Sequence, residues 1–114
     1  MRASVAAFAA AALLACFAAH ADCFKNIRGE TVCGKGKCEA DYQGRVFCAP
    51  AGGDAMRDRY GVVHCGVGSC VADAVGKLWC SKEVGGGAAA DMNGNPKCLG
   101  GCEEASQQKC EAGK

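Results

Sequence analysis

The chain has 114 residues, with 13 Lys and Arg, 12 Asp and Glu, 11 Cys and 17 Gly. We expect a chain of this length to form one small domain at most. Only 18 Val, Ile, Leu, Met, Phe, Tyr and Trp side chains follow residue 21, too few for a core held by apolar burial alone. The same stretch contains ten cysteines, which is typical of disulfide scaffolds.

The first 21 residues have the pattern of a secretory signal peptide. Met1-Arg2 supplies a positive charge, residues 3–15 are apolar, and Ala19-His20-Ala21 is a small-x-small cleavage site. The apolar run is shorter than the roughly 20 residues of a membrane-spanning helix. We therefore expect residues 1–21 to be a signal peptide. Residues 22–114 would then be a secreted or periplasmic domain without a transmembrane segment.

The segment Leu13-Leu14-Ala15-Cys16 offers an alternative, because it resembles a bacterial lipoprotein box in which Cys16 becomes a lipid anchor. In either case ten cysteines remain, and an even number is what a full set of five disulfides in an oxidising compartment requires. The predicted disulfide cysteines are Cys23, Cys33, Cys38, Cys48, Cys65, Cys70, Cys80, Cys98, Cys102 and Cys110.

The charges of residues 22–114 balance, with 12 Lys and Arg against 12 Asp and Glu. Both signs alternate along the chain and form no blocks. This pattern is typical of a solvated mixed surface and favours neither a nucleic-acid partner nor an anionic-surface partner.

One motif occurs five times and consists of Asp or Asn, two residues, Gly, three residues and Cys. A longer repeat, Cys-Gly-x-Gly-x-Cys-x-Ala-Asp-x-x-Gly-x-x-x-Cys, begins at Cys33 and again at Cys65. We assign the repeats to residues 33–64 and 65–97, with a partial third copy from Cys98. The five motifs are Asn26-Gly29-Cys33, Asp41-Gly44-Cys48, Asp58-Gly61-Cys65, Asp73-Gly76-Cys80 and Asp91-Gly94-Cys98.

The motif has the chemistry of a β-turn. Its first side chain accepts a backbone N–H two residues on, and its glycine supplies the left-handed conformation that closes a type I turn with a bulge. The flanks, such as Arg45-Val46-Phe47-Cys48, carry β-branched and aromatic residues. We predict a small disulfide-rich, mainly β fold of five tandem short hairpins with glycine-rich links. A short helix near the C-terminus is an option.

The turn register predicts three cross-strand disulfides. If Asp41 opposes Arg45, then Cys38 faces Cys48 at a non-hydrogen-bonded position, where opposed Cα atoms are closest, about 4.5 Å apart. The same spacing joins Cys23 to Cys33 and Cys70 to Cys80. A rival scheme pairs Cys33 with Cys38 and Cys65 with Cys70 across the Gly-x-Gly loop.

The pairing of Cys65, Cys98, Cys102 and Cys110 stays open. Residues 103–109 are helix formers with Glu in the first turn. A helix there separates Cys102 from Cys110 by about 12 Å, so that both would bridge to Cys65 and Cys98. A loop there would instead allow a Cys102–Cys110 and a Cys65–Cys98 bridge.

Catalytic residue types are scarce after residue 21, with one His (His64), one Thr and three Ser. They form no catalytic constellation, and we expect no enzyme activity and no cofactor. Thiolate binding of Zn or Cu(I) is an alternative use of the cysteines, but their spacing fits hairpin closure better than paired ligands, and we expect no metal.

Four aromatic side chains are candidates for partner contact. Phe47 and Trp79 each precede the closing Cys of a hairpin. We expect them to cover the disulfides, or alternatively to line an exposed face on which a partner docks. Tyr42 and Tyr60 occupy turn positions and are the next candidates for such contacts.

The repeats resemble those of small exported cysteine-rich bacterial proteins with Cys-Gly-x-Gly-x-Cys and Asp-x-x-Gly-x-x-x-Cys motifs, which have no assigned activity. The stretch Cys33-x4-Cys38-x9-Cys48 also resembles the middle of an EGF-like domain, without that family's Cys-x-Cys step. The resemblance implies export and a stapled architecture.

We therefore expect an exported, non-catalytic structural or binding module whose partner is a protein or surface ligand. The first alternative is an inhibitor-like or toxin-like secreted effector that uses the loop Gly34-Lys35-Gly36-Lys37. The second alternative is a cysteine-rich metal-binding protein.

Overall fold

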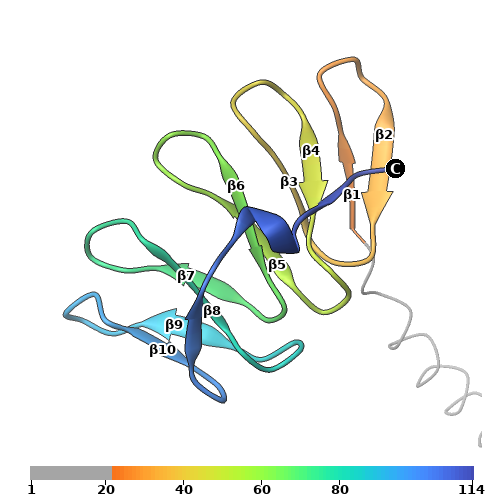
Figure 1. Ribbon diagram of the computed structural model, residues 1–114. Coiled ribbons are helices and arrows are strands. Elements are labelled where there is room, and N and C mark those ends of the chain that lie inside the picture. The colour runs from red at the N-terminus through yellow and green to blue at the C-terminus, as the bar shows by residue number, and fades with distance from the viewer. Residues whose placement is uncertain (1–21) are drawn as a thin grey trace, which may run out of the picture.

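The computed structural model describes residues 22–114, which form short strands and one 3-10 helix (Figure 1). The predicted signal peptide and the alternative lipid anchor at Cys16 lie outside these residues. The elements are β1 (Asp22–Lys25), β2 (Thr31–Gly34), β3 (Cys38–Ala40), β4 (Val46–Cys48), β5 (Asp54–Arg57), β6 (Val63–Gly66), β7 (Cys70–Ala72), β8 (Leu78–Ser81), β9 (Ala88–Ala90), β10 (Pro96–Cys98), β11 (Cys102–Glu104), η1 (Gln107–Lys109) and β12 (Glu111–Ala112). The prediction of a disulfide-rich, mainly β fold is confirmed.

Five antiparallel hairpins follow one another along the chain: β1–β2, β3–β4, β5–β6, β7–β8 and β9–β10, here numbered 1 to 5. Their turns lie along one edge of the molecule and the links between hairpins along the opposite edge (Figure 1). In hairpin 2 the Asp41 N–H donates to the Arg45 carbonyl at 2.8 Å, and Cys38 pairs with Cys48. This is the register that the turn motif predicts.

Each of the five turns is closed by the same set of hydrogen bonds. In turn 3 the Oδ1 atom of Asp58 accepts the N–H groups of Tyr60 at 2.9 Å and Val62 at 3.0 Å. The Gly61 N–H donates to the Asp58 carbonyl at 3.1 Å, and Gly61 has a φ of +80°. Asn26, Asp41, Asp73 and Asp91 accept the equivalent pairs of N–H groups in the other turns.

The hairpins are stacked one after another (Figure 1), and the buried side chains form thin layers between them. One face of each hairpin presents a cysteine of the repeated motif, and the opposite face presents the residue before that cysteine. Val32 of hairpin 1 packs on Val46 and Cys48 of hairpin 2, while Phe47 of hairpin 2 packs on the layer that contains Cys65. Disulfides therefore take the place that large apolar side chains fill in a larger core.

The outer faces of hairpins 1 and 5 carry polar residues at positions where the faces between hairpins carry apolar residues. Thr31 of hairpin 1 is exposed, whereas its equivalents Val46 and Val63 are buried. Lys97 of hairpin 5 is exposed at the position that the half-buried Trp79 occupies in hairpin 4. Such polar outer faces are what the first and last units of a repeat array need for solubility.

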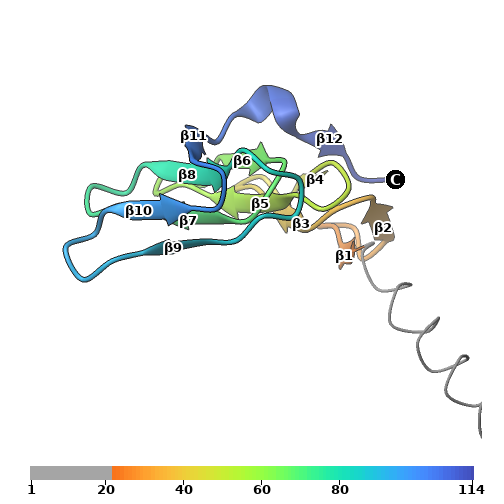
Figure 2. The same cartoon turned by 90° about the horizontal axis from the view of Figure 1, so that it is seen from below.

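The last residues form an extended strap, here defined as residues 102–114, which crosses one side of the stack (Figure 2). β11 pairs with β8, Ser106 pairs with Cys65 in β6, and β12 pairs with β4. Lys114 then exchanges two backbone hydrogen bonds with Cys33 in β2. Of the two options for residues 103–109, the helical one is realised only in the short η1, because successive hairpin edges supply backbone partners to an extended chain.

Five disulfides staple the fold. Three of them close hairpins at Cα–Cα distances of 3.9 to 4.0 Å and are the predicted Cys23–Cys33, Cys38–Cys48 and Cys70–Cys80. The other two are Cys65–Cys110 and Cys98–Cys102, so Cys102 and Cys110 do bridge to Cys98 and Cys65, as the first of the two open alternatives had it. The Cys102–Cys110 and Cys65–Cys98 alternative and the rival Gly-x-Gly scheme do not occur.

The Cys65–Cys110 bridge has the largest effect on chain entropy. It spans 45 residues, against 10 for each hairpin bridge. In the chain-entropy model these separations correspond to about 4 and about 3 kcal/mol. The longest bridge also ties the strap to the middle of the stack.

The first glycine of each Cys-Gly-x-Gly-x-Cys motif lies against the disulfide of the following hairpin. A Cβ atom on Gly34 would meet the Cys48 Cβ at 2.2 Å, and one on Gly66 would meet the Cys80 Cβ at 2.4 Å. Any side chain at these positions would push adjacent hairpins apart. The motif therefore sets the spacing of the layers.

Gly66→Ala tests this contact, with Gly87→Ala as the matched control because nothing lies within 4 Å of a Cβ there. We expect Gly66→Ala to lower the free energy of unfolding by about 1 to 3 kcal/mol, because the added methyl group overpacks the contact with Cys80. Gly87→Ala should leave it nearly unchanged. Denaturant unfolding with the disulfides intact measures both, and equal stabilities would contradict the role of Gly66.

Candidate functional site

The five turns form one continuous surface, which we call the turn edge and define as residues 26–29, 41–44, 58–61, 73–76 and 91–94. The second residue of each turn lies over the glycine of the following turn. A Cβ atom on Gly44 would meet Ile27, and one on Gly61 would meet Tyr42. The Tyr42 N–H also donates to the Gly61 carbonyl at 2.9 Å. The turns are therefore held in fixed positions relative to one another.

Every turn of the turn edge carries one large apolar side chain that points into solvent. The side chains of Tyr42 and Tyr60 are among them, with exposed fractions of 62% and 76%. Isolated exposed apolar residues are ordinary, but one in each of five stacked turns makes a row along the whole edge. The complete row is Ile27, Tyr42, Tyr60, Val75 and Met92.

The structure separates the four predicted contact residues into two groups. Tyr42 and Tyr60 lie on the turn edge. Phe47 is half-buried and packs against the layer that holds Cys65 and Cys110, so it covers a disulfide. Trp79 is half-buried, and its indole N–H donates to the Asp73 Oδ2 at 2.9 Å.

The second carboxylate oxygen of three turn aspartates accepts a side-chain donor from its own hairpin. Asp41 accepts from the Arg45 guanidinium at 2.8 Å, and Asp73 accepts from the Trp79 indole. In hairpin 3 the equivalent contact joins the Asp58 Oδ2 to the His64 Nε2 at 2.8 Å. His64 thus occupies the structural position of Trp79 and braces its turn.

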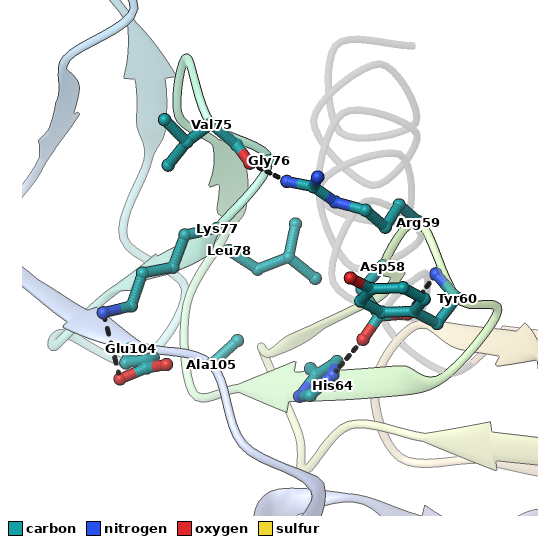
Figure 3. Close-up of a pocket in the computed structure, with 10 residues that line it drawn as sticks. All are labelled: Asp58, Arg59, Tyr60, His64, Val75, Gly76, Lys77, Leu78, Glu104 and Ala105. Atoms are coloured by element: carbon teal, nitrogen blue, oxygen red, sulfur yellow. Dashed lines mark hydrogen bonds and ion pairs between the residues drawn. The ribbon is translucent and has the colours of Figure 1, made fainter.

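A groove of about 310 Å³ lies between turns 3 and 4, beside the strap (Figure 3). Tyr60 and the Arg59 side chain form one wall, Val75 and Lys77 the other, and Glu104 of the strap closes one end. The Arg59 guanidinium donates to the Val75 carbonyl, and Lys77 forms an ion pair with Glu104 at 3.6 Å. The groove is thus bridged by contacts between its own walls.

Positive side chains stack on aromatic rings in three successive hairpins. Arg45 lies 5.7 Å from the Phe47 ring centroid and Lys77 lies 4.9 Å from the Trp79 ring centroid. Arg59 lies 6.0 Å from the Tyr60 ring centroid. These contacts hold cations beside the turn edge.

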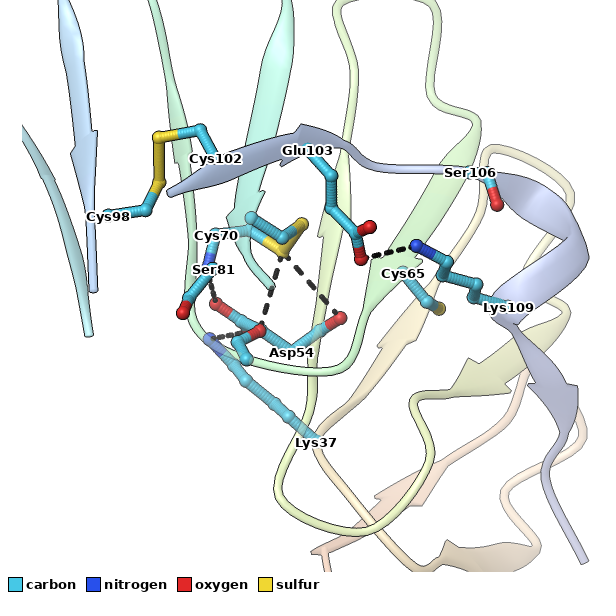
Figure 4. Close-up of a disulfide and its surroundings, with 12 residues drawn as sticks. Lys37, Asp54, Cys65, Cys70, Ser81, Cys98, Cys102, Glu103, Ser106 and Lys109 are labelled. Atoms are coloured by element: carbon cyan, nitrogen blue, oxygen red, sulfur yellow. Dashed lines mark hydrogen bonds and ion pairs between the residues drawn. A yellow bond between two sulfur atoms is a disulfide. The ribbon is translucent and has the colours of Figure 1, made fainter. Parts of the chain in front are cut away.

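The loop Gly34-Lys35-Gly36-Lys37, proposed for an inhibitor-like effector, takes part in the packing of the links. Gly36 is buried, and its N–H donates to the Ala49 carbonyl at 3.1 Å. Lys37 forms an ion pair with Asp54 at 3.4 Å, and the other Asp54 oxygen accepts the Cys70 N–H at 3.0 Å (Figure 4). Within this four-residue loop, only Lys35 is exposed and makes no hydrogen bond or ion pair through its side chain.

All ten cysteines of residues 22–114 are oxidised in pairs, so none of them offers a thiolate to a metal. Figure 4 shows one of these bridges, Cys98–Cys102. Within the same residues, no helix has the length and apolar character needed to cross a membrane.

Comparison of the chain with protein-family models, with curated proteins and with solved structures found no match. The geometry of residues 22–114 is therefore the basis for assigning a function.

Sequence reasoning missed three members of the exposed row, namely Ile27, Val75 and Met92. Each occupies the second or third position of its turn, as Tyr42 and Tyr60 do. An apolar residue at one of these positions in every copy of the motif is the signal that could have identified the row.

The turn aspartates share a direction of pKa shift. Burial raises the pKa of Asp41 and Asp58, but hydrogen bonds from backbone N–H groups and from Arg45 or His64 outweigh it, so both pKa values lie below the usual value. The Trp79 hydrogen bond lowers the pKa of Asp73, and the Asn95 backbone hydrogen bond lowers that of Asp91. The folded state thus favours the charged form of all four.

Lowered pKa values in the folded state make stability depend on pH in one direction. The stabilisation is present above the unfolded-state pKa of about 3.9 and is lost as the pH falls through the lower folded-state values. We expect the free energy of unfolding, measured by denaturant titration from pH 7 to pH 2, to fall below about pH 4. Asp58→Asn retains the Oδ1 acceptor, as Asn26 does naturally, and should show a shallower fall. A slope unchanged from wild type would contradict this assignment.

Proposed function

We propose that this protein is an exported, non-catalytic binding module whose recognition surface is the turn edge. The observation that supports this proposal best is the exposed apolar row, with one large side chain on each of five stacked turns. Rigid scaffolds present recognition residues on loops in this way, and large exposed apolar patches mark interaction sites. The five disulfides favour an oxidising compartment, which agrees with the predicted signal peptide.

The disulfide staples suit this role because they fix the surface before a partner arrives. Turns that are already ordered lose little conformational freedom on binding, so more of the contact energy contributes to affinity. Tyr and Arg, both present along the edge, are enriched among the residues that dominate binding energy.

The test compares turn-edge variants with link-edge variants in the producing cells. We expect part of the exported, tagged protein to sediment with the cell envelope or to elute in complexes larger than one chain. Tyr42→Ser combined with Tyr60→Ser should shift this part several-fold toward the free monomer, because two exposed aromatic anchors are lost.

The matched control is Val84→Ser combined with Leu99→Ser, which removes two apolar side chains of similar exposure outside the turn edge. Circular dichroism and a count of free thiols check that all variants are folded and oxidised. Equal distributions of the two double variants, or a wild-type protein that is entirely monomeric and free, would contradict the proposal.

A further inference from the structure

We infer that the groove between turns 3 and 4 binds a neutral oligosaccharide of β-1,4-linked pyranose rings. This inference rests on the proposed function and names the chemical class of the ligand. Leu78 and Ala105, both buried, form an apolar floor in the groove. Polar side chains lie around this floor (Figure 3). They belong to Asp58, Arg59, Tyr60, His64, Lys77 and Glu104.

A pyranose ring matches this arrangement in both of its parts. Its C–H groups form an apolar face, and the hydroxyls around its edge both donate and accept hydrogen bonds. The groove offers donors in Arg59 and Lys77 and acceptors in Asp58 and Glu104. The two cations balance the two carboxylates, so this rim favours a ligand rich in hydroxyls over a ligand with a net charge. Small-molecule sites commonly combine an apolar lining with a few polar groups in this way.

His64 departs from the repeat at a position between layers. Hairpins 1 and 4 carry Val32 and Trp79 at the position six residues after the first turn residue, whereas hairpin 3 carries a half-buried histidine. The His64 Nε2 atom contacts the Asp58 Oδ2 at 2.8 Å. Within residues 22–114, no hydrogen bond engages the Nδ1 atom of this ring. A half-buried ring nitrogen without a protein partner is available to a ligand hydroxyl.

A second groove shows which of these groups the stacking does not require. It lies between turns 1 and 2, at the equivalent place one repeat earlier in the chain, and has a volume of about 250 Å³. Val32 replaces His64 there, and Arg28 replaces Tyr60. Its strap residue is Gly113, which has no side chain. Stacking alone therefore produces a groove, whereas the aromatic ring, the histidine and the strap carboxylate are specific to the groove between turns 3 and 4.

An adjoining cavity extends the site across the strap. It has a volume of about 370 Å³ and shares His64 and Glu104 with the groove. Ser106, Gln107 and Gln108 also line it, and their hydroxyl and amides donate and accept hydrogen bonds without adding charge. Two adjoining cavities suit a chain of several rings. Rings joined by β-1,4 bonds form an extended ribbon with accessible C–H faces, which fits an open groove with an apolar floor.

The contacts within the groove leave its side chains available to a ligand. Lys77 and Glu104 are 3.6 Å apart, and their side chains are 46% and 61% exposed. Such an exposed ion pair is weak, so both groups can turn toward ligand hydroxyls at little cost. Arg59 lies over one face of the Tyr60 ring, and Tyr60 is 76% exposed, which leaves ring surface for the C–H groups of a sugar.

NMR titration of the exported, oxidised protein tests the inference. The probes are cellohexaose and chitohexaose, β-1,4-linked hexasaccharides of glucose and of N-acetylglucosamine, and they distinguish these two sources of such chains. We expect saturable binding of at least one of them, with amide shifts concentrated in residues 58–64, 75–78 and 104–108. Tyr60→Ser should weaken this binding about fivefold or more, because an aromatic anchor is lost. Lys77→Ala combined with Glu104→Ala should weaken it several-fold.

Matched controls separate the groove from the rest of the surface. Tyr42→Ser is the control for Tyr60→Ser, because Tyr42 is 62% exposed on turn 2 and does not line the groove. Lys82→Ala combined with Glu83→Ala is the control for the charged pair, since both residues are exposed in the link after β8. Neither control should change the affinity. Absence of saturable binding to both hexasaccharides, or equal losses in the controls, would overturn the inference.

A soluble uncharged peptide of alternating Gly and Ser is the third probe. Its binding at the same residues with equal affinity would also overturn the inference, in favour of an extended polypeptide ligand. The two proposals fail separately. If Tyr42→Ser combined with Tyr60→Ser releases the protein in producing cells while neither hexasaccharide binds, the binding module remains and only the oligosaccharide is removed as its ligand.

Discussion

The fold depends on one side-chain oxygen in each turn that accepts two backbone N–H groups. This contact, together with a glycine at positive φ, fixes which residues face each other across the hairpin. A slip of one residue would move every cysteine to the opposite face. With the observed register, Cys38 faces Cys48 and Cys70 faces Cys80, so that each pair forms a bridge without crossing between hairpins.

From this local constraint the larger structure follows in steps. Hairpins 1, 2 and 4 each carry one cross-strand bridge. Gly34 and Gly66 let the preceding hairpin approach the bridges of hairpins 2 and 4. Stacking places the turns side by side, and the strap then locks four hairpins together through backbone pairing and the Cys65–Cys110 bridge. The outcome is a narrow edge of rigid turns, each of which exposes one large apolar side chain.

The sequence was sufficient to predict what is local. Turn chemistry and the spacing of Cys23, Cys33 and their repeats depend on about ten residues, so the hairpins and three bridges could be derived. The strap could not, because the helix-forming residues 103–109 adopt an extended path that only the assembled hairpin edges stabilise. The exposed row was missed because its members lie far apart in sequence, and stacking alone brings Ile27 and Met92 onto one edge.

The disulfide map of the protein isolated from the producing cells tests this account most directly. Digestion without reduction, followed by mass spectrometry of the linked peptides, identifies each pair. The account predicts Cys23–Cys33, Cys38–Cys48, Cys70–Cys80, Cys65–Cys110 and Cys98–Cys102, with no free thiol in residues 22–114. Bridges from Cys33 to Cys38 and from Cys65 to Cys70, or free thiols that carry a metal, would contradict the closure of hairpins 1, 2 and 4 by their own bridges.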